Sequence, residues 1–113
     1  MRCLSRIAAS LFVALLMSVP AVAQAPVNYR LSFPAPEHHY AVIEVTFPGI
    51  PNGTLETRMS RSSPGRYALH EFSKNVFELK AFDGKGKELA VTRPNPYQWD
   101  VAKHDGTVRV VYK

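Results

Sequence analysis

The pair His70-Glu71 is the first candidate for chemistry in this sequence, because it opens the segment His-Glu-Phe-Ser-Lys. The zinc motif H-E-x-x-H places two histidines four residues apart, so that one helix face presents both ring nitrogens to the metal. Here the fifth position is Lys74, whose positive charge repels a metal ion. The sequence therefore favours a polar surface pair beside a packed Phe72 over a zinc site.

The other histidines have no spacing that suits a metal. His38 and His39 are adjacent, and neighbouring side chains on a strand point to opposite faces. His104 lies alone in a segment rich in turn residues. We therefore expect surface or strand-edge histidines, and no metal ligands, in this chain.

Nucleophilic and phosphate-binding motifs are equally incomplete. Ser62 and Ser63 precede a proline, but the G-x-S-x-G elbow is absent and no histidine–acid pair completes a triad. Gly84 and Gly86 lie in Asp-Gly-Lys-Gly-Lys, which lacks the strand-to-helix setting of a phosphate loop. A hairpin turn explains these glycines, so the sequence predicts no catalytic residue.

Two aromatic residues could bind a ligand without doing chemistry. Tyr97 and Trp99 are close in sequence, and their ring faces could stack on a sugar or a peptide. The alternative is that Trp99, the only tryptophan, fills the core of a small β domain. We favour the core position and keep the binding platform as the alternative.

The first 23 residues have the three-part layout of a secretory signal. Arg2 and Arg6 precede an uncharged run over residues 7–19, and Ala21-Val22-Ala23 is a small-x-small cleavage pattern. A membrane anchor is the competing interpretation, but a spanning helix needs about 20 apolar residues. We predict cleavage between Ala23 and Gln24, a secreted or periplasmic protein, and no membrane attachment after cleavage.

Composition limits the mature chain, residues 24–113, to one small domain. Cleavage removes Arg2, Arg6 and the only cysteine, so the net charge falls from +5 to +3. Lysines and arginines are interspersed with acids and form no basic stripe, which argues against nucleic-acid binding. Without a disulfide, the core or a neighbouring domain must supply the stability.

Alternating apolar residues predict about seven short strands and no convincing helix. In the first of them, Tyr29, Leu31 and Phe33 share one side, as in a half-buried strand. The turn residues of 48–53 predict an antiparallel hairpin between the second and third strands. Pro94 and Pro96 are expected to break the chain, and residues 67–75 to be irregular with a short turn. The predicted strands cover residues 29–33, 39–47, 54–60, 75–83, 88–92, 97–101 and 107–113.

Strands of this length, separated by turns every 8–12 residues, are typical of an antiparallel β-sandwich or barrel. We predict an all-β sandwich. The last strand pattern runs to Lys113 without a closing turn, so we expect the domain to be truncated at this end.

The order of several short motifs resembles the N-terminal β domain of the M61 (glycyl aminopeptidase) family of zinc peptidases. The resemblance covers residues 29–113 and departs from the family at Ser62, where an aromatic residue commonly precedes Ser-Pro-Gly. The matching motifs are Tyr-x-Leu-x-Phe-Pro-x-Pro from Tyr29, Ser63-Pro64-Gly65 with Tyr67, Asn75-Val76, Ala81-Phe82-Asp83, Trp99 and the final Val-x-Val-x-Tyr.

The resemblance implies a non-catalytic accessory domain that supports a downstream zinc peptidase domain, in which zinc activates water. No zinc ligand or other cofactor is implied in this chain, because the family's catalytic motif has no counterpart here. The loop of Ser63, Pro64, Gly65 and Tyr67 is the expected contact with the catalytic domain. The alternative is a free-standing secreted β-sandwich that binds a peptide or glycan, with Trp99 at its site.

Overall fold

The computed structural model describes residues 25–113, which contain eight β-strands, two short 3-10 helices and no α-helix. The predicted signal peptide, with its cleavage site between Ala23 and Gln24, lies outside the described residues. No helix within 25–113 has the length and apolar character needed to cross a membrane. The elements are β1 (Asn28–Ser32), η1 (Pro36–His38), β2 (Val42–Phe47), β3 (Leu55–Arg58), η2 (Phe72–Asn75), β4 (Lys80–Asp83), β5 (Glu88–Leu89), β6 (Val91–Asn95), β7 (Gln98–Val101) and β8 (Val108–Tyr112).

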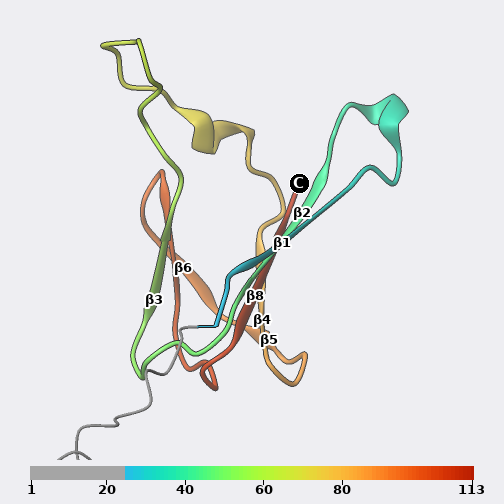
Figure 1. Cartoon of the computed structure of the whole chain (residues 1–113), viewed down its shortest axis with the longest axis vertical. Coiled ribbons are helices and arrows are strands. Elements are labelled where there is room, and N and C mark those ends of the chain that lie inside the picture. The colour runs from blue at the N-terminus through green and yellow to red at the C-terminus, as the bar shows by residue number, and fades with distance from the viewer. Residues whose placement is uncertain (1–24) are drawn as a thin grey trace, which may run out of the picture.

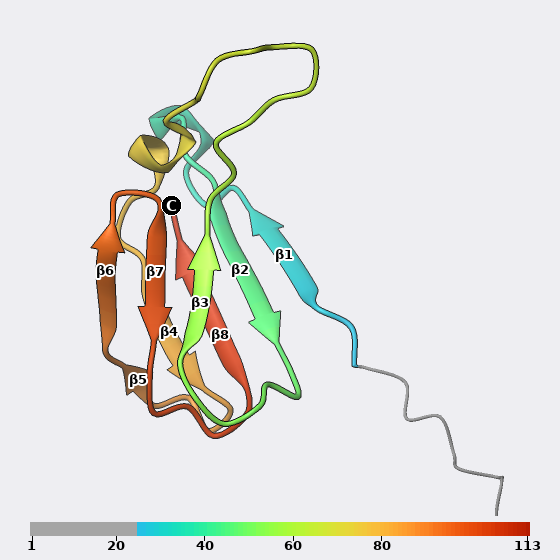
Figure 2. The same ribbon diagram turned by 90° about the vertical axis from the view of Figure 1, so that its left-hand side faces the viewer.

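The strands form two antiparallel sheets that face each other (Figures 1 and 2). The larger sheet has the order β1-β2-β8-β4-β5, and the smaller sheet has the order β3-β7-β6. The all-β prediction with two antiparallel layers is thus confirmed. Eight strands replace the predicted seven because residues 88–92 are divided between the two sheets.

The predicted hairpin between the second and third strands is wrong. β2 pairs with β1 and β8, whereas β3 pairs with β7 in the other sheet. The connection therefore crosses from one layer to the other instead of turning back within a sheet. Ile50 anchors this crossing, since its N–H donates to the carbonyl oxygen of Gly106 over 2.8 Å.

The chain changes sheets a second time at Ala90. Leu89 pairs with Ala81 in the larger sheet, and Val91 pairs with Val101 in the smaller one. Pro94 does not break the chain as predicted, because it lies inside β6, at an edge of the smaller sheet. An edge strand tolerates proline, and the β6–β7 register shifts between Thr92 and Asn95.

Two predicted strands begin later than expected. Residues 36–38 form the 3-10 helix η1 with Pro36 in its first turn, and His39 adopts a left-handed conformation (φ 56°), so β2 starts at Val42. Glu78 also has a positive φ of 51° and interrupts residues 75–83 before β4. Phe77 nevertheless exchanges backbone hydrogen bonds with Lys113 (2.8 and 2.9 Å). Residues 72–75 form the short turn that was expected.

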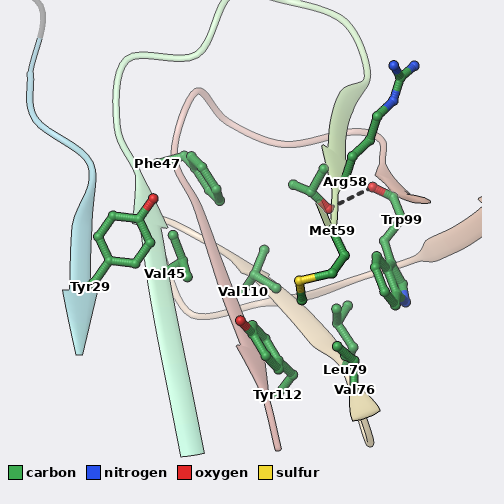
Figure 3. A pocket seen from close by; sticks show the side chains of 11 residues that line it. Tyr29, Val45, Phe47, Arg58, Met59, Val76, Leu79, Trp99, Val110 and Tyr112 are labelled. Carbon is green, nitrogen blue, oxygen red and sulfur yellow. Dashed lines mark hydrogen bonds between the residues drawn. The ribbon is translucent and has the colours of Figure 1, made fainter. Parts of the chain in front are cut away.

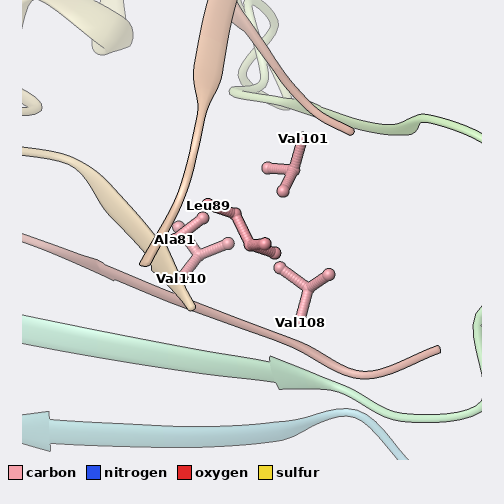
Figure 4. Close-up of a cluster of buried hydrophobic side chains, with 5 residues drawn as sticks. All are labelled: Ala81, Leu89, Val101, Val108 and Val110. Carbon is pink, nitrogen blue, oxygen red and sulfur yellow. The ribbon is translucent and has the colours of Figure 1, made fainter. Parts of the chain in front are cut away.

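The core lies where the two sheets are joined by β5 and β6. It consists of Ala81, Leu89, Val101, Val108 and Val110, whose side chains point toward one another in Figure 4. Val101 comes from the smaller sheet and the other four come from the larger one. Fully burying a side chain of this size stabilises the fold by about 1.5–3 kcal/mol, so this cluster holds the two layers together.

Candidate interdomain surface

The loop that contains Ser63, Pro64, Gly65 and Tyr67 is closed at its base and projects from one end of the molecule (Figure 2). His70 N–H donates to the carbonyl oxygen of Arg61 over 2.8 Å, which brings the two ends of the loop together. At its tip, Arg66 N–H donates to Ser63 oxygen over 3.2 Å, and Gly65 adopts a φ of 78°. A positive φ is accessible to glycine without steric strain, so the sequence Ser-Pro-Gly suits this turn.

The apolar side chains of this loop are exposed to solvent. Tyr67 is 107% exposed and Leu69 is 73% exposed, so neither packs against the domain. Large apolar side chains that are held out by an ordered loop are typical of a binding surface rather than of a core. The structure brings the four predicted loop residues together in one projecting segment.

Trp99 lies apart from that loop. It is only 5% exposed, on the inner side of β7, and the guanidinium of Arg93 covers its ring at 4.6 Å from the centroid. Thr57 Oγ1 donates to the Trp99 carbonyl oxygen over 2.9 Å, which fixes the backbone of β7 against β3. Trp99 therefore occupies the core position, with Arg93 over its ring and only a small part of its side chain exposed.

An apolar hollow of about 170 Å³ lies between the sheets, next to Trp99. Figure 3 shows Tyr29, Val45 and Phe47 on one side of it, and Met59 and Trp99 on the other. Tyr112 also lines the hollow, and burial raises the pKa of its hydroxyl above the usual value. None of Ser63, Pro64, Gly65 and Tyr67 lines it.

The first strand exposes apolar side chains that were predicted to be half-buried. Tyr29 is 69% exposed and Leu31 is 60% exposed, and the neighbouring Val27 and Phe33 are exposed as well. The alternation itself is present, because Arg30 lies on the opposite face and its guanidinium is 3.7 Å from Glu44. The prediction of half-burial is wrong because no second layer covers this edge of the larger sheet among residues 25–113.

A second, more polar hollow lies between η2 and the β6–β7 turn. Its walls include the cations Arg61, Lys74 and Arg93 and one acid, Glu71. Arg61 lies over the ring of Tyr97 at 4.6 Å, so its positive charge is already engaged with an aromatic face.

The polar side chains on the outer face of the smaller sheet bond to one another. Gln98 accepts a hydrogen bond from Arg58 over 3.0 Å and donates one to Asp100 over 2.7 Å.

The histidines do not assemble a reactive centre. His70 stacks on Phe72 with ring centroids 4.9 Å apart, and it precedes the short η2 rather than lying in a long helix. Its Nε2 atom is buried without a hydrogen-bond partner. Within residues 25–113, no group of three or more His, Cys, Asp and Glu side chains could hold a metal ion.

Sequence reasoning identified the loop but missed the apolar edge of β1. The turn residues Ser63-Pro64-Gly65 were a local signal, and local signals can be read from a single sequence. The exposure of Tyr29 and Leu31 depends on how many strands the facing sheet has, and no residue in β1 carries that information.

Comparisons with known proteins agree with this architecture. The structure is similar to that of an aminopeptidase N family protein from Idiomarina loihiensis, with 25% sequence identity and a TM-score of 0.58. The match covers 64% of this chain but only 12% of that protein, which is thus much longer. A comparison with curated protein sequences found no match. A family model described as the peptidase M61 N-terminal domain matches residues 28–113, and the chain therefore belongs to this family.

Proposed function

We propose that this chain is the non-catalytic N-terminal domain of a longer zinc aminopeptidase of the M61 type. Its role is to support the catalytic domain through the projecting loop of Ser63, Pro64, Gly65 and Tyr67. The longer protein acts outside the cytoplasm, in the periplasm or after secretion, and residues 1–23 direct its export. The domain contributes contacts and no reacting group.

The observation that carries this proposal is the set of large apolar side chains left in solvent by an otherwise ordered domain. Tyr67 and Leu69 on the loop, and Tyr29 and Leu31 on β1, are each at least 60% exposed. Large apolar side chains left in solvent on a small domain suit a place where another folded unit packs. The great length of the similar aminopeptidase family protein supports such a neighbour.

The alternative, a free-standing domain that binds a peptide or glycan, has less support. It requires an accessible aromatic platform, and Trp99 is buried with Arg93 over its ring. Tyr97 is likewise covered by Arg61. Each of the two rings that suggested a sugar or peptide site thus has an arginine of the same domain over it.

Zinc belongs to the catalytic domain of the proposed longer protein. The residues described here do not fit a zinc site, because they contain no cluster of three or more suitable ligands. His70 packs on Phe72, and Lys74 stands where a second histidine of the zinc motif is needed. No step of peptide hydrolysis is assigned to these residues.

The first test is the DNA sequence beyond the codon for Lys113. The proposal expects an open reading frame that continues into a domain with the motif H-E-x-x-H. A stop codon directly after Lys113 would contradict it and would make ligand binding by a free-standing domain the leading function.

Substitutions in the longer protein test the contact itself. Pro64→Ala and Tyr67→Ala should weaken docking of the two domains, because a buried interface tyrosine contributes about 2 kcal/mol. The expected results are lower peptidase activity and a lower melting temperature. Asn52→Ala is the matched control, since Asn52 is an exposed residue of the β2–β3 connection, and this connection lies at the opposite end of the sheets from the loop (Figure 2). Wild-type behaviour of both loop variants would remove the loop from the interface.

A further inference from the structure

The two facing sheets differ in width, and the smaller sheet does not extend over the β1 edge of the larger one. Sheet β1-β2-β8-β4-β5 has five strands, whereas sheet β3-β7-β6 has three. In Figure 2, β3 is the last strand of the nearer sheet, and β2 and β1 continue beyond it. The side of the molecule next to β3 therefore has one layer where the rest of the domain has two.

The strand that extends beyond β3 presents its apolar side to this open space. Tyr29 is opposite Val45, and Leu31 is opposite Ile43 in the β1–β2 register. Directly opposed residues of antiparallel strands share a face, and Val45 is buried on the inner face beside the hollow. Tyr29 and Leu31 thus lie on the inner face, although they are mostly exposed.

The outer face of the same strands carries charged side chains that are paired with one another. Glu44 accepts a hydrogen bond from Arg109 over 2.8 Å and lies 3.7 Å from Arg30. Arg109 also covers the ring of Phe82 at 4.6 Å. The outer face is thus a charged surface with its own ion pairs, whereas the inner face of β1 is not covered by any other segment of residues 25–113.

The edge of β3 next to this space has unpaired backbone groups. Among residues 25–113, β3 is hydrogen-bonded to β7 alone. Met59 N–H donates to the Tyr97 carbonyl oxygen over 2.9 Å. In an antiparallel pair every second residue faces its partner strand with its N–H and C=O groups, so Thr57 and Leu55 also point these groups toward β7. The N–H and C=O groups of Glu56 and Arg58 therefore point away from β7, toward the open edge.

An occupant of this place must satisfy two requirements at once. It must offer backbone donors and acceptors to Glu56 and Arg58, which requires an extended strand rather than a helix. It must also present apolar side chains at alternate positions to Tyr29, Leu31 and the hollow. A β-strand with one apolar face meets both requirements.

We propose that a strand from the part of the longer peptidase chain that follows residue 113 pairs with the free edge of β3 and covers the inner face of β1 and β2. This inference rests on the proposed function, which supplies the longer chain. The similar aminopeptidase family protein has ample length for such a strand, since this chain spans only 12% of it. The added strand extends the three-stranded sheet and makes the two layers more equal.

Amide hydrogen exchange in the longer protein measures the pairing directly. The Glu56 and Arg58 amides should exchange at least about tenfold more slowly than the amide of Gly65 at the exposed loop tip, because a paired edge is protected. In the 113-residue chain these two amides should exchange as fast as that of Gly65. The Met59 amide, which bonds to Tyr97, should be protected in both proteins.

A proline variant removes the outward donor without disturbing the β3–β7 pairing. Glu56→Pro deletes one N–H that points to the open edge, and an edge position without an inward bond tolerates proline. Glu56→Ala is the matched control, because both variants lose the carboxylate that pairs with Arg58 at 3.0 Å. In the longer protein, Glu56→Pro should lower the melting temperature by several degrees relative to Glu56→Ala. In the 113-residue chain the two variants should melt together.

The outcomes separate this inference from the proposed function. A longer peptidase whose Glu56 and Arg58 amides exchange as fast as Gly65 would keep the proposed function and overturn the added strand. Protection of both amides in the 113-residue chain that grows with concentration would identify a second copy as the occupant and overturn the inference. A stop codon after Lys113 would overturn both.

Discussion

Trp99 shows how a single residue decides between two functional interpretations. An exposed indole could stack on a ligand, whereas a buried one stabilises the fold, and the sequence alone allows both. The position of Trp99 at the centre of the three-stranded sheet, under Arg93, makes it a structural residue. Its neighbours along β7, Gln98 and Val101, are also buried, whereas Asp100 is half-buried.

We predict that Trp99→Ala lowers the free energy of unfolding by about 3–5 kcal/mol, as expected for a buried tryptophan. Chemical denaturation of the 113-residue chain measures this value. Tyr67→Ala is the aromatic control, and its effect should stay within about 0.5 kcal/mol because its side chain is fully exposed. Equal effects of the two substitutions would show that Trp99 is not part of the core.

At the scale of the elements, Asp105 connects two turns. Its Oδ1 atom accepts from Gly84 N–H over 3.0 Å and from Thr107 N–H over 3.2 Å, which links the β4–β5 turn to the segment before β8. The backbone N–H of Gly84, followed by that of Thr107, holds the pKa of the Asp105 carboxyl below its usual value. The carboxylate therefore accepts these bonds best when it is ionised.

The lowered pKa of Asp105 predicts a pH dependence of stability. Because the folded pKa is below the unfolded one, this contribution is present above the unfolded pKa and is lost as the pH falls through the folded pKa. Asp105→Asn keeps an oxygen acceptor but does not titrate, so its stability should fall less steeply below about pH 4. Urea unfolding at a series of acidic pH values measures the slope.

A second variant separates the pH dependence caused by Asp105 from a general effect of acid on stability. A Cβ at position 84 would lie 3.1 Å from Asp105 Oδ2 and 3.3 Å from Thr107 Cβ, so Gly84→Ala should push the two turns apart. It should reduce the acid-dependent slope as Asp105→Asn does. If the wild type and both variants had the same slope, Asp105 would not link the two turns.

The sequence predicted the strands better than their pairing. Period-two alternation is local, so it located most strands to within a few residues. Pairing is not local: the turn residues between β2 and β3 suit a hairpin, but Ile50 bonds to Gly106 and the chain crosses to the other sheet. The change of sheet at Ala90 was missed for the same reason, since no residue there differs from an ordinary strand position.

The candidate surface was predictable only in part. Serine, proline and glycine favour turns, so Ser63-Pro64-Gly65 predicts a turn from sequence alone. In the structure, the loop that contains this turn and Tyr67 projects from the domain (Figure 2). Tyr29 and Leu31 have the alternation of a half-buried strand, and half-burial requires a facing layer. That layer ends at β3, so the exposure of β1 became visible only when the width of both sheets was known.

At the scale of the whole molecule, one side of the domain is well packed, and the other side exposes apolar side chains to solvent. The side of β5 and β6 has a packed core, and the outer face of the larger sheet is covered by the Arg30, Glu44 and Arg109 charges. Within residues 25–113, the side of β1 and β3 has apolar side chains in solvent and an unpaired strand edge. Surfaces of this kind bind other apolar surfaces, including dyes and further copies of the chain.

The 113-residue chain should therefore bind the apolar dye ANS in its folded state, and Leu31→Lys should reduce this binding. Because Leu31 is already 60% exposed, the substitution should change the free energy of unfolding by no more than about 0.5 kcal/mol. Arg30→Ala is the matched control on the opposite face of the same strand, and it should leave dye binding unchanged. Dye fluorescence and chemical denaturation of the same samples give both quantities. A large loss of stability in Leu31→Lys would mean that the apolar side of β1 is already covered within this chain, and β1 could then not receive the added strand that we propose.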